Sequence, residues 1–416
     1  MAGYIIEGGK KLSGSLTVSG SKNASLPIIA GTILINGITT LYNVPDINDI
    51  KITLKILSFL GCKVHKKNGK VTIDTRSMHN HEIPHDLMRQ MRSSVVLAGA
   101  IIGRFKNAAF SYPGGCDIGA RPIDLHLKGF QKLGIKIEEN SGNIRCRCDK
   151  IINGKINLDF PSVGATENLI LASVLSDGET IIYNAAMEPE IVDLQKFLNK
   201  AGAKISGAGT SEIRIIGVKK LNEIKYTIMP DRIEAGTLLC GVAITGGFLE
   251  LKNVIPEHIS PVLHKLEECG CKIQTSNRVI TLEAPKRLQA VDIKTTPYPG
   301  FPTDMQSVFL SILTVAKGTS LVIENIFENR FKYTNELKRM GAKITIEGKT
   351  AVIKGTKKLY GAQVKSTDLR GGAALVIAAL SAKSITKIDD IEHILRGYEK
   401  LDVKLNSIGA DIKLYK

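Results

Sequence analysis

The sequence predicts an α/β protein of two similar domains, and the main observation behind this prediction is a sixfold internal repeat. Six times, an amphipathic run ends in an apolar residue and a glycine, and a short strand-like segment follows. Glycine adopts positive φ without strain, so a glycine that closes a helical pattern predicts the end of a helix. Spaced 73, 68, 68, 71 and 68 residues apart, the six glycines are Gly61, Gly134, Gly202, Gly270, Gly341 and Gly409.

A second pattern lies upstream of each glycine. An apolar, helix-like run comes first, then a turn and a strand, as in ATENLILASVLSDGETIIYNA at residues 165–185. Each repeat therefore reads as helix, strand, helix, strand, strand. The first helix is apolar nearly all round, which predicts burial, whereas the second carries charges on one face and should be exposed.

Chain length and repeat count together predict the domain boundaries. A chain of 416 residues is too long for one ordinary core. Two sets of three repeats give a first domain over residues 20–229, which carries a cysteine loop, and a second over 1–19 plus 230–416. The breaks fall near Gly20 and Pro230. Residues 1–19 read as a strand that pairs with the second domain.

Composition restricts the class of protein. With 43% hydrophobic and 23% charged residues, the chain is typical of soluble globular proteins. The formal net charge of +16 indicates an anionic partner: nucleic acid, a membrane surface or phosphorylated small molecules. The first residues lack a signal-peptide pattern, and the apolar runs are too short for membrane insertion. Seven cysteines, an odd number, argue against a disulfide framework and predict a cytoplasmic protein.

The residues that open the six buried helices suggest an anion site. Free backbone N–H groups and a partial positive charge gather at a helix start. If the three buried helices of a domain lie parallel, their starts converge and form an anion receptor. Helix capping is the alternative, above all for Ser93 and Thr303. The opening residues are Lys22-Asn23, Arg92-Ser93-Ser94, Ser162-Val163-Gly164, Asp231-Arg232, Thr303-Asp304 and the run from Asp368 to Gly372.

Most of the cysteines read as packing residues. The repeat aligns several of them with apolar positions, and one more lies inside an apolar helix. Two others alternate with arginines on a strand, but their spacing does not match a zinc site, so no metal is expected. The first group is Cys62, Cys269, Cys271 and Cys240, and the second is Cys146 and Cys148.

Cys116 differs from the other cysteines. It lies in the glycine-rich loop SYPGGCDIGARPIDL, which is longer than the corresponding loops of the other repeats, and Arg121 follows five residues later. A thiol in an electropositive loop can ionise and react. The alternative is an ordinary turn with an incidental cysteine.

Seven motifs, spread over the whole chain, resemble those of UDP-N-acetylglucosamine enolpyruvyl transferases. The resemblance implies a two-domain inside-out α/β barrel of the EPSP synthase type, with three βαβαββ repeats per domain. The motifs are GSKNASLP at 20–27, PGGCDIGARPIDLH at 113–126, SVGATEN at 162–168, FPTDMQ at 301–306, FENRF at 327–331, DLRGGAAL at 368–375 and RGYE at 396–399.

The resemblance also implies a reaction. The enolpyruvyl group of phosphoenolpyruvate passes to the 3′-hydroxyl of UDP-N-acetylglucosamine, and phosphate is released. This is the first committed step of peptidoglycan precursor synthesis, which serves cell wall biogenesis, cell shape and cell division, and it is the target of fosfomycin. No cofactor is implied, the partners are the two small substrates, and a monomer is expected.

Site roles follow from the same resemblance. Cys116 is the general acid and reactive thiol, Asp304 takes the proton of the sugar hydroxyl, and Lys22 and Arg396 complete the catalytic set. Phosphoenolpyruvate contacts Lys22, Asn23, Arg121, Arg330, Arg370 and Arg396, with Lys22, Arg121 and Arg396 on the phosphate and Arg330 and Arg370 on the carboxylate. The nucleotide sugar contacts Asn23, Arg92, Arg121, Pro122, Ile123, Asp124, Leu125, Ser162, Val163, Gly164, Asp304 and Ile326. One departure is Phe160, where many relatives carry lysine.

Two other functions compete with this interpretation. The same chemistry on 3-phosphoshikimate uses a similar fold, but Asn23 replaces the serine of its GSKS-type opening and a PGGC loop is not part of that pattern. A nucleic-acid-binding protein would fit the net charge. Its lysines, however, are spread in pairs rather than gathered in a tail, and aromatic residues make up only 5% of the chain.

Overall fold

The structure is a computed structural model that describes residues 2–114 and 123–415, and it divides into two compact units. The first unit comprises residues 20–114 and 123–229, and the second comprises 2–19 and 230–415. Among the described residues, the chain passes from one unit to the other after Ser19 and after Met229. The predicted site residues Cys116, Arg121 and Pro122 lie outside the described residues.

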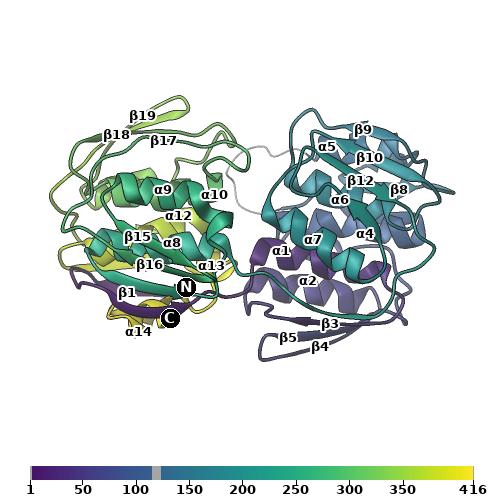
Figure 1. The fold of residues 1–416 in the computed structure, drawn as a ribbon, viewed down its shortest axis with the longest axis horizontal. Helices are drawn as coiled ribbons and strands as arrows, with labels where there is room; N and C mark the ends of the chain where they lie inside the picture. Colours follow the sequence, from purple (N-terminus) through teal and green to yellow (C-terminus); the bar gives the residue numbers. More distant parts are fainter. Residues whose placement is uncertain (1, 115–122, 416) are drawn as a thin grey trace. The chain divides into compact units, whose positions relative to one another are not determined.

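The first unit contains three repeats (Figure 1). Its helices are α1 Lys22–Gly31, η1 Thr32–Leu34, α2 Asn48–Phe59, α3 His85–Met88, η2 Arg92–Val95, α4 Val96–Phe105, α5 Asp124–Lys132, α6 Val163–Ser173 and α7 Pro189–Lys200. Its strands are β3 Ile38–Tyr42, β4 Lys63–Lys67, β5 Lys70–Asp74, β6 Asn107–Ser111, β7 Lys136–Asn140, β8 Asn143–Arg147, β9 Lys155–Asn157, β10 Glu179–Tyr183, β11 Lys204–Ser206, β12 Glu212–Ile216 and β13 Ile224–Thr227.

The second unit repeats the same order of elements. Its helices are α8 Arg232–Thr245, η3 Pro256–Ile259, α9 Ser260–Glu268, α10 Thr303–Leu313, α11 Thr334–Arg339, α12 Leu369–Ser381, α13 Glu392–Leu395 and α14 Leu401–Ser407. Its strands are β1 Gly3–Glu7, β2 Ser13–Thr17, β14 Phe248–Lys252, β15 Lys272–Ser276, β16 Val279–Glu283, β17 Ile293–Lys294, β18 Thr319–Ile323, β19 Lys343–Glu347, β20 Thr350–Lys354, β21 Gln363–Lys365, β22 Ile385–Asp389 and β23 Ile412–Tyr415.

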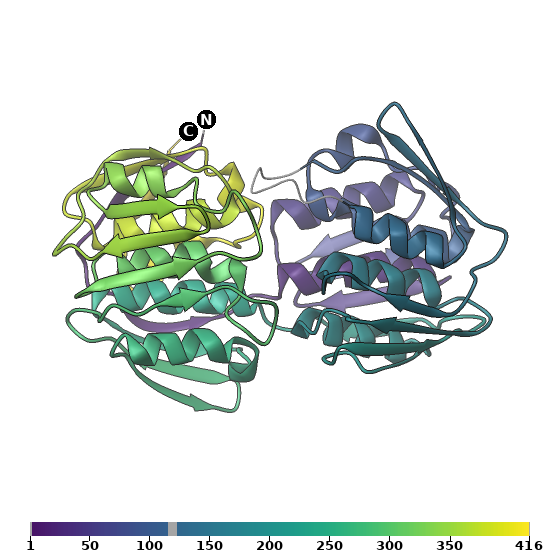
Figure 2. The same ribbon diagram turned by 90° about the horizontal axis from the view of Figure 1, so that it is seen from above.

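The first helix of every repeat is buried, as its apolar composition predicts. In the second unit α8, α10 and α12 pack against one another, and the strands lie outside them (Figures 1 and 2). In the first unit α4 packs on both α1 and α6. All six repeat glycines have positive φ, between 75° and 107°, and each directly follows the C-cap residue of the second helix. The predicted helix ends are therefore confirmed.

The sheets show a pairing that periodicity did not predict. In several repeats a short parallel strand, which precedes the buried helix, adds to the edge of the sheet, as β9 does beside β10. At both chain crossings this strand stays behind in the unit that the chain leaves. In this way β13 completes the sheet of β3 in the first unit, and β2 completes the sheet of β14 in the second.

Residues 2–19 pair within the second unit, as expected, but they form two strands rather than one. β2 pairs in parallel with β14. β1 lies antiparallel between β22 and β23, where it takes the place of the missing last strand of the sixth repeat.

The cysteines predicted to be packing residues are in the core. Cys62, Cys240, Cys269 and Cys271 are buried free thiols. Cys146 is also buried. Within residues 2–114 and 123–415, no group of His, Cys, Asp or Glu side chains could hold a metal ion. In the same part of the chain, no helix is both long enough and apolar enough to cross a bilayer.

Candidate active site

In the second unit, Asp304 lies between two arginines at a pair of helix starts. Asp304 is the second residue of α10, and Arg370 is the second residue of α12. One Nη of Arg370 donates to Oδ2 of Asp304 at 2.9 Å, and one Nη of Arg330 donates to Oδ1 at 2.9 Å. Three predicted site residues are thus brought together. A carboxylate gripped on both oxygens is held in a fixed orientation.

The two arginines have N–H donors that no described residue accepts from. Both are 4% exposed, and the Nε atoms of Arg330 and Arg370 have no hydrogen-bond partner among the described residues. Burial by itself would lower the pKa of Arg370, but the charge of Asp304 raises it above its ordinary value. Buried guanidinium groups with unused N–H donors are suited to a bound anion.

The start of the third buried helix of this unit lies nearby. Asp231 caps α8 by accepting from the N–H groups of Ile233 and Glu234. Its charge acts on Arg370, and the Arg370 guanidinium lies over the ring of Tyr398 at 5.3 Å. The predicted convergence of helix starts is therefore present within the second unit.

Capping accounts for some of the helix starts and not for others. Asp231 and Asp368 accept from backbone N–H groups of their own helices. Thr303 does not cap α10, because its hydroxyl donates to Glu324 Oε2 at 3.0 Å. The capping interpretation is therefore wrong for Thr303.

The remaining predicted residues of the second unit are Ile326 and Arg396. The backbone N–H of Ile326 donates to Oε1 of Glu324 at 2.8 Å, which fixes the chain just after β18. Arg396 directly follows α13 and is half-buried. Glu324 was not predicted as a site residue.

In the first unit, Lys22 opens α1 beside a carboxylate. Its Nζ lies 2.8 Å from Oδ2 of Asp49, a residue of α2 whose side chain is 1% exposed. A cation at a helix start is unfavourable unless an anion is near, and here the protein supplies one. Sequence reasoning missed Asp49. A signal was present, because Asp49, Thr53 and Leu57 form one buried i, i+4, i+8 stripe of α2.

A buried histidine, His126, bonds to the residue of α6 that is joined to the start of α4. His126 is bonded at Nδ1 to the side-chain amide of Asn168, which also donates to the carbonyl of Val95. Burial and the charge of Arg92 lower the pKa of His126 to about 4. His126 is thus a buried neutral side chain, and Asn168 joins α6 to the start of α4.

Several predicted nucleotide-sugar residues lie at the starts of α5 and α6. Ser162 caps α6 through the N–H of Ala165. A Cβ on Gly164 would come within 3.1 Å of the His126 ring, so that position needs glycine or a shift of the ring. Asp124 is exposed at the start of α5, whereas Ile123 is packed in the core. Ile123 could therefore reach a ligand only through its backbone.

A buried acidic group at α6 was also missed. Glu167 lies within the SVGATEN motif and is buried. Burial, followed by the charges of Glu190 and Glu188, raises the pKa of Glu167 well above its ordinary value. Burial therefore favours the protonated carboxyl group, which can donate a hydrogen bond as well as accept one.

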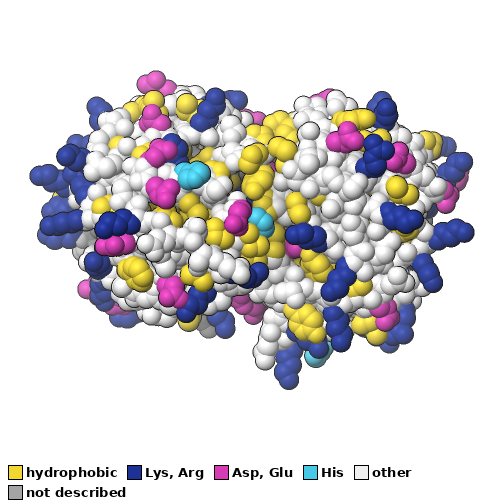
Figure 3. Space-filling model, in the orientation of Figure 1, with side chains coloured by type: hydrophobic (Ala, Val, Ile, Leu, Met, Phe, Trp, Pro, Cys, Tyr) yellow, Lys and Arg dark blue, Asp and Glu magenta, His cyan; other side chains and the backbone are white. Residues whose placement is uncertain are grey.

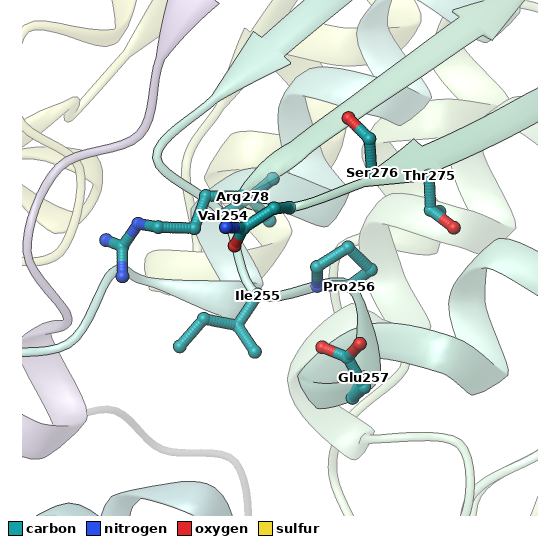
Figure 4. A pocket seen from close by; sticks show the side chains of 8 residues that line it. Val254, Ile255, Pro256, Glu257, Thr275, Ser276 and Arg278 are labelled. Atoms are coloured by element: carbon teal, nitrogen blue, oxygen red, sulfur yellow. The ribbon is translucent and has the colours of Figure 1, made fainter.

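Two surface features lie apart from these clusters. A hollow of about 370 Å³ in the second unit is lined by residues 254–257 and 275–278, none of which is a predicted site residue (Figure 4). On the face drawn in Figure 3, lysine and arginine side chains are scattered and interspersed with acidic ones. Such a distribution differs from the single basic stripe that is typical of a nucleic-acid surface.

Known proteins that match nearly the whole length of the chain are carboxyvinyltransferases. Residues 6–405 match the family model described as EPSP synthase (3-phosphoshikimate 1-carboxyvinyltransferase). UDP-N-acetylglucosamine 1-carboxyvinyltransferase 2 of Caldanaerobacter subterraneus subsp. tengcongensis is 54% identical over 413 residues, which cover 99% of each chain. UDP-N-acetylglucosamine 1-carboxyvinyltransferase of Geobacter metallireducens is 49% identical over 412 residues, again with 99% of each chain covered.

Solved structures share the fold. The enolpyruvyl transferase NikO from Streptomyces tendae superposes with a TM-score of 0.89 at 22% identity, covering 99% of this chain and 98% of that one. EPSP synthase from Acinetobacter baumannii superposes with a TM-score of 0.78 at 19% identity over the full length of both. The predicted fold class is thereby confirmed. The chain belongs to the EPSP synthase family and, within it, to the UDP-N-acetylglucosamine 1-carboxyvinyltransferases.

Proposed function

We propose that the chain transfers the enolpyruvyl group of phosphoenolpyruvate to the 3′-hydroxyl of UDP-N-acetylglucosamine and releases phosphate. Two observations support this proposal. Relatives named UDP-N-acetylglucosamine 1-carboxyvinyltransferase are about half identical to this chain over nearly its whole length. In addition, Asp304 is held by two buried arginines whose Nε donors are unused by described residues. The second observation carries most weight, because it concerns this chain's own side chains.

In the second unit, Arg330 and Arg370 hold the carboxylate of phosphoenolpyruvate. A planar guanidinium binds two oxygens at once, and both groups are already desolvated, so they lose little hydration when the ligand arrives. Asp304 then accepts the proton of the 3′-hydroxyl as general base. A positioned acid or base contributes about 10²–10⁴-fold to a rate.

In the first unit, the helix starts bind the charged parts of the substrates. Lys22 and Asn23 at α1 hold the phosphate of phosphoenolpyruvate, together with Arg121 and with Arg396, which belongs to the second unit. The start of α6 at Ser162, Val163 and Gly164 receives the diphosphate of the nucleotide sugar, because its free N–H groups favour anions. The nucleotide sugar further contacts Arg92, Pro122, Asp124, Leu125, Ile326 and the backbone of Ile123.

The chemical steps follow from these roles. The Cys116 thiol gives its proton to the methylene carbon of phosphoenolpyruvate, and the sugar oxygen bonds to the adjacent carbon as Asp304 removes its proton. A tetrahedral intermediate results, which carries both the sugar and the phosphate. Loss of phosphate and of one methyl proton then restores the double bond and gives the enolpyruvyl ether. The gathered cations stabilise the charge that develops on the departing phosphate.

We further propose that the enzyme works as a cytoplasmic monomer at the first committed step of peptidoglycan precursor synthesis. The buried cysteines Cys62, Cys240, Cys269 and Cys271 are free thiols, which persist in a reducing compartment.

Phosphate release tests the proposal directly. The protein is incubated with phosphoenolpyruvate and either UDP-N-acetylglucosamine or shikimate 3-phosphate, and a reaction without acceptor measures background hydrolysis. Phosphate should appear in proportion to product with UDP-N-acetylglucosamine only. Turnover with shikimate 3-phosphate, or none with either acceptor, would overturn the assignment.

A further inference from the structure

In most repeats, one strand directly follows the buried helix and lies between two others in the sheet; the residue after this central strand shows a recurring pattern. In three repeats it is an asparagine with φ between 53° and 58°. Its side-chain amide donates to the carbonyl oxygen of the residue that follows the parallel edge strand, at 2.7–2.9 Å. The asparagines are Asn43, Asn184 and Asn253, and their acceptors are Ile228, Leu158 and Val18. This bond ties the two strand ends together.

The fifth repeat keeps this bond but inserts one residue before it. Lys294 and Ile323 are in register at the ends of β17 and β18. The corresponding amide bond, to the carbonyl of Thr295 at 3.1 Å, comes from Asn325, one position later than in the other repeats. The inserted residue is Glu324. The strand ends can be tied without a carboxylate, so the repeat scaffold does not explain this residue.

Glu324 is a buried carboxylate that accepts four hydrogen bonds. It is 1% exposed. Oε1 accepts from the hydroxyl of Thr295 at 2.9 Å and from the backbone N–H groups of Ile326 at 2.8 Å and Phe327 at 3.2 Å. Oε2 accepts from the hydroxyl of Thr303 at 3.0 Å. Four donors on one buried carboxylate make a well-defined anchor.

The groups that Glu324 joins lead to the reacting residues. Thr303 is the first residue of α10, and Asp304 is the second. Arg330 donates both to the carbonyl of Thr303 at 3.1 Å and to Asp304. The Ile326–Phe327 backbone begins the segment that carries Arg330. Glu324 thus connects the start of α10 with the segment that supplies one of the arginines on Asp304.

We propose that Glu324 is a positioning residue, which sets the place of Asp304 relative to Arg330 and Ile326 and so aligns the general base with the sugar hydroxyl. This inference rests on the proposed function. A misplacement of about 1 Å at a reacting group can cost about 100-fold in rate. Glu324 itself touches neither substrate.

Three variants test the role. Glu324→Ala removes all four bonds, and kcat should fall by about 10- to 100-fold, with a smaller rise in the KM for UDP-N-acetylglucosamine. Glu324→Gln can still accept from the two N–H groups and can donate to the Thr303 oxygen, so it should restore most of kcat. Thr303→Val breaks only the link to α10, and it should lower kcat without changing that KM.

The control separates positioning from stability. Asn406 makes two hydrogen bonds with the backbone of Ile412 in the same unit, so Asn406→Ala should lower Tm and leave kcat unchanged. The inference fails if Glu324→Ala lowers Tm but keeps kcat and KM within twofold of wild type, or if Glu324→Gln is as slow as Glu324→Ala. Wild-type enzyme without turnover would refute the proposed function instead, so the two failures are distinguishable.

Discussion

The two units use the same scaffold but surround the charged side chains at their helix starts differently. In the first unit a cation, Lys22, stands at the start of a buried helix, and the second helix of the same repeat supplies the carboxylate of Asp49. In the second unit a carboxylate, Asp304, is the second residue of another buried helix, α10, and two arginines surround it. The repeat therefore fixes a position with free N–H groups, and the side chains decide whether that position binds or reacts.

The largest effect on activity is expected for Cys116, the proposed proton donor. Cys116→Ala should lower phosphate release by about 10³–10⁴-fold, because the proton donor is lost. Binding of UDP-N-acetylglucosamine, measured by calorimetry, should stay within a few-fold. Cys116→Asp, which keeps an ionisable proton donor, should retain more activity and resist fosfomycin. Full activity of Cys116→Ala would remove the thiol from the mechanism.

Asp304→Asn tests the reacting side of the comparison. An amide cannot take up the hydroxyl proton, so kcat should fall by about 10²–10³-fold. Rapid-quench measurement of the first turnover shows whether chemistry is the slowed step. A kcat within threefold of wild type would mean that another group is the base.

Lys22→Met tests the binding side. The KM for phosphoenolpyruvate should rise by at least tenfold, and the unfolding free energy should fall by about 3–5 kcal/mol, because a buried carboxylate loses its cation. The double variant Lys22→Met/Asp49→Asn should regain most of the stability but none of the affinity. Recovery of both in the double variant would assign Lys22 a purely structural role.

Arg370→Lys should have a smaller effect on activity, and it tests the arginines of the second unit. An ammonium replaces the planar fork, so kcat/KM for phosphoenolpyruvate should fall by about 10–100-fold. Arg104→Lys is the matched control, because Arg104 donates to backbone carbonyls and to Asn36, lies over the Phe105 ring, and is not a predicted site residue. The control should change Tm and not kcat/KM. Equal losses of kcat/KM in both variants would contradict a specific role for Arg370.

A separate effect concerns stability at acid pH. His126 has a folded pKa of about 4 against an ordinary value of 6.5. Its contribution to stability is therefore complete above about pH 6.5 and is lost as the pH falls towards 4. The loss in unfolding free energy should be about 3 kcal/mol. His126→Gln should flatten this part of the curve in urea titrations at several pH values, and an unchanged slope would show that another group titrates.

Local signals predicted most of the fold. The six glycines and the apolar runs are properties of short windows, so helix ends and helix burial could be read directly. The pairing of the parallel edge strands at the chain crossings could not be predicted in this way. β13 is only four residues long, and it pairs with β3, which lies some 180 residues earlier in the chain. Glu324 was missed for the same reason. Its role depends on contacts made in space, and in the sequence it resembles an ordinary turn residue.

The position of β1 between β22 and β23 has a consequence for biosynthesis. All described residues of the first unit lie between residues 20 and 229, so it can close its sheets before the rest of the chain is made. β1 leaves the ribosome earlier than any of these residues, yet both of its neighbours emerge near the end of translation. The nascent chain must therefore carry an unpaired strand past a finished unit, and an unpaired strand can pair with other chains.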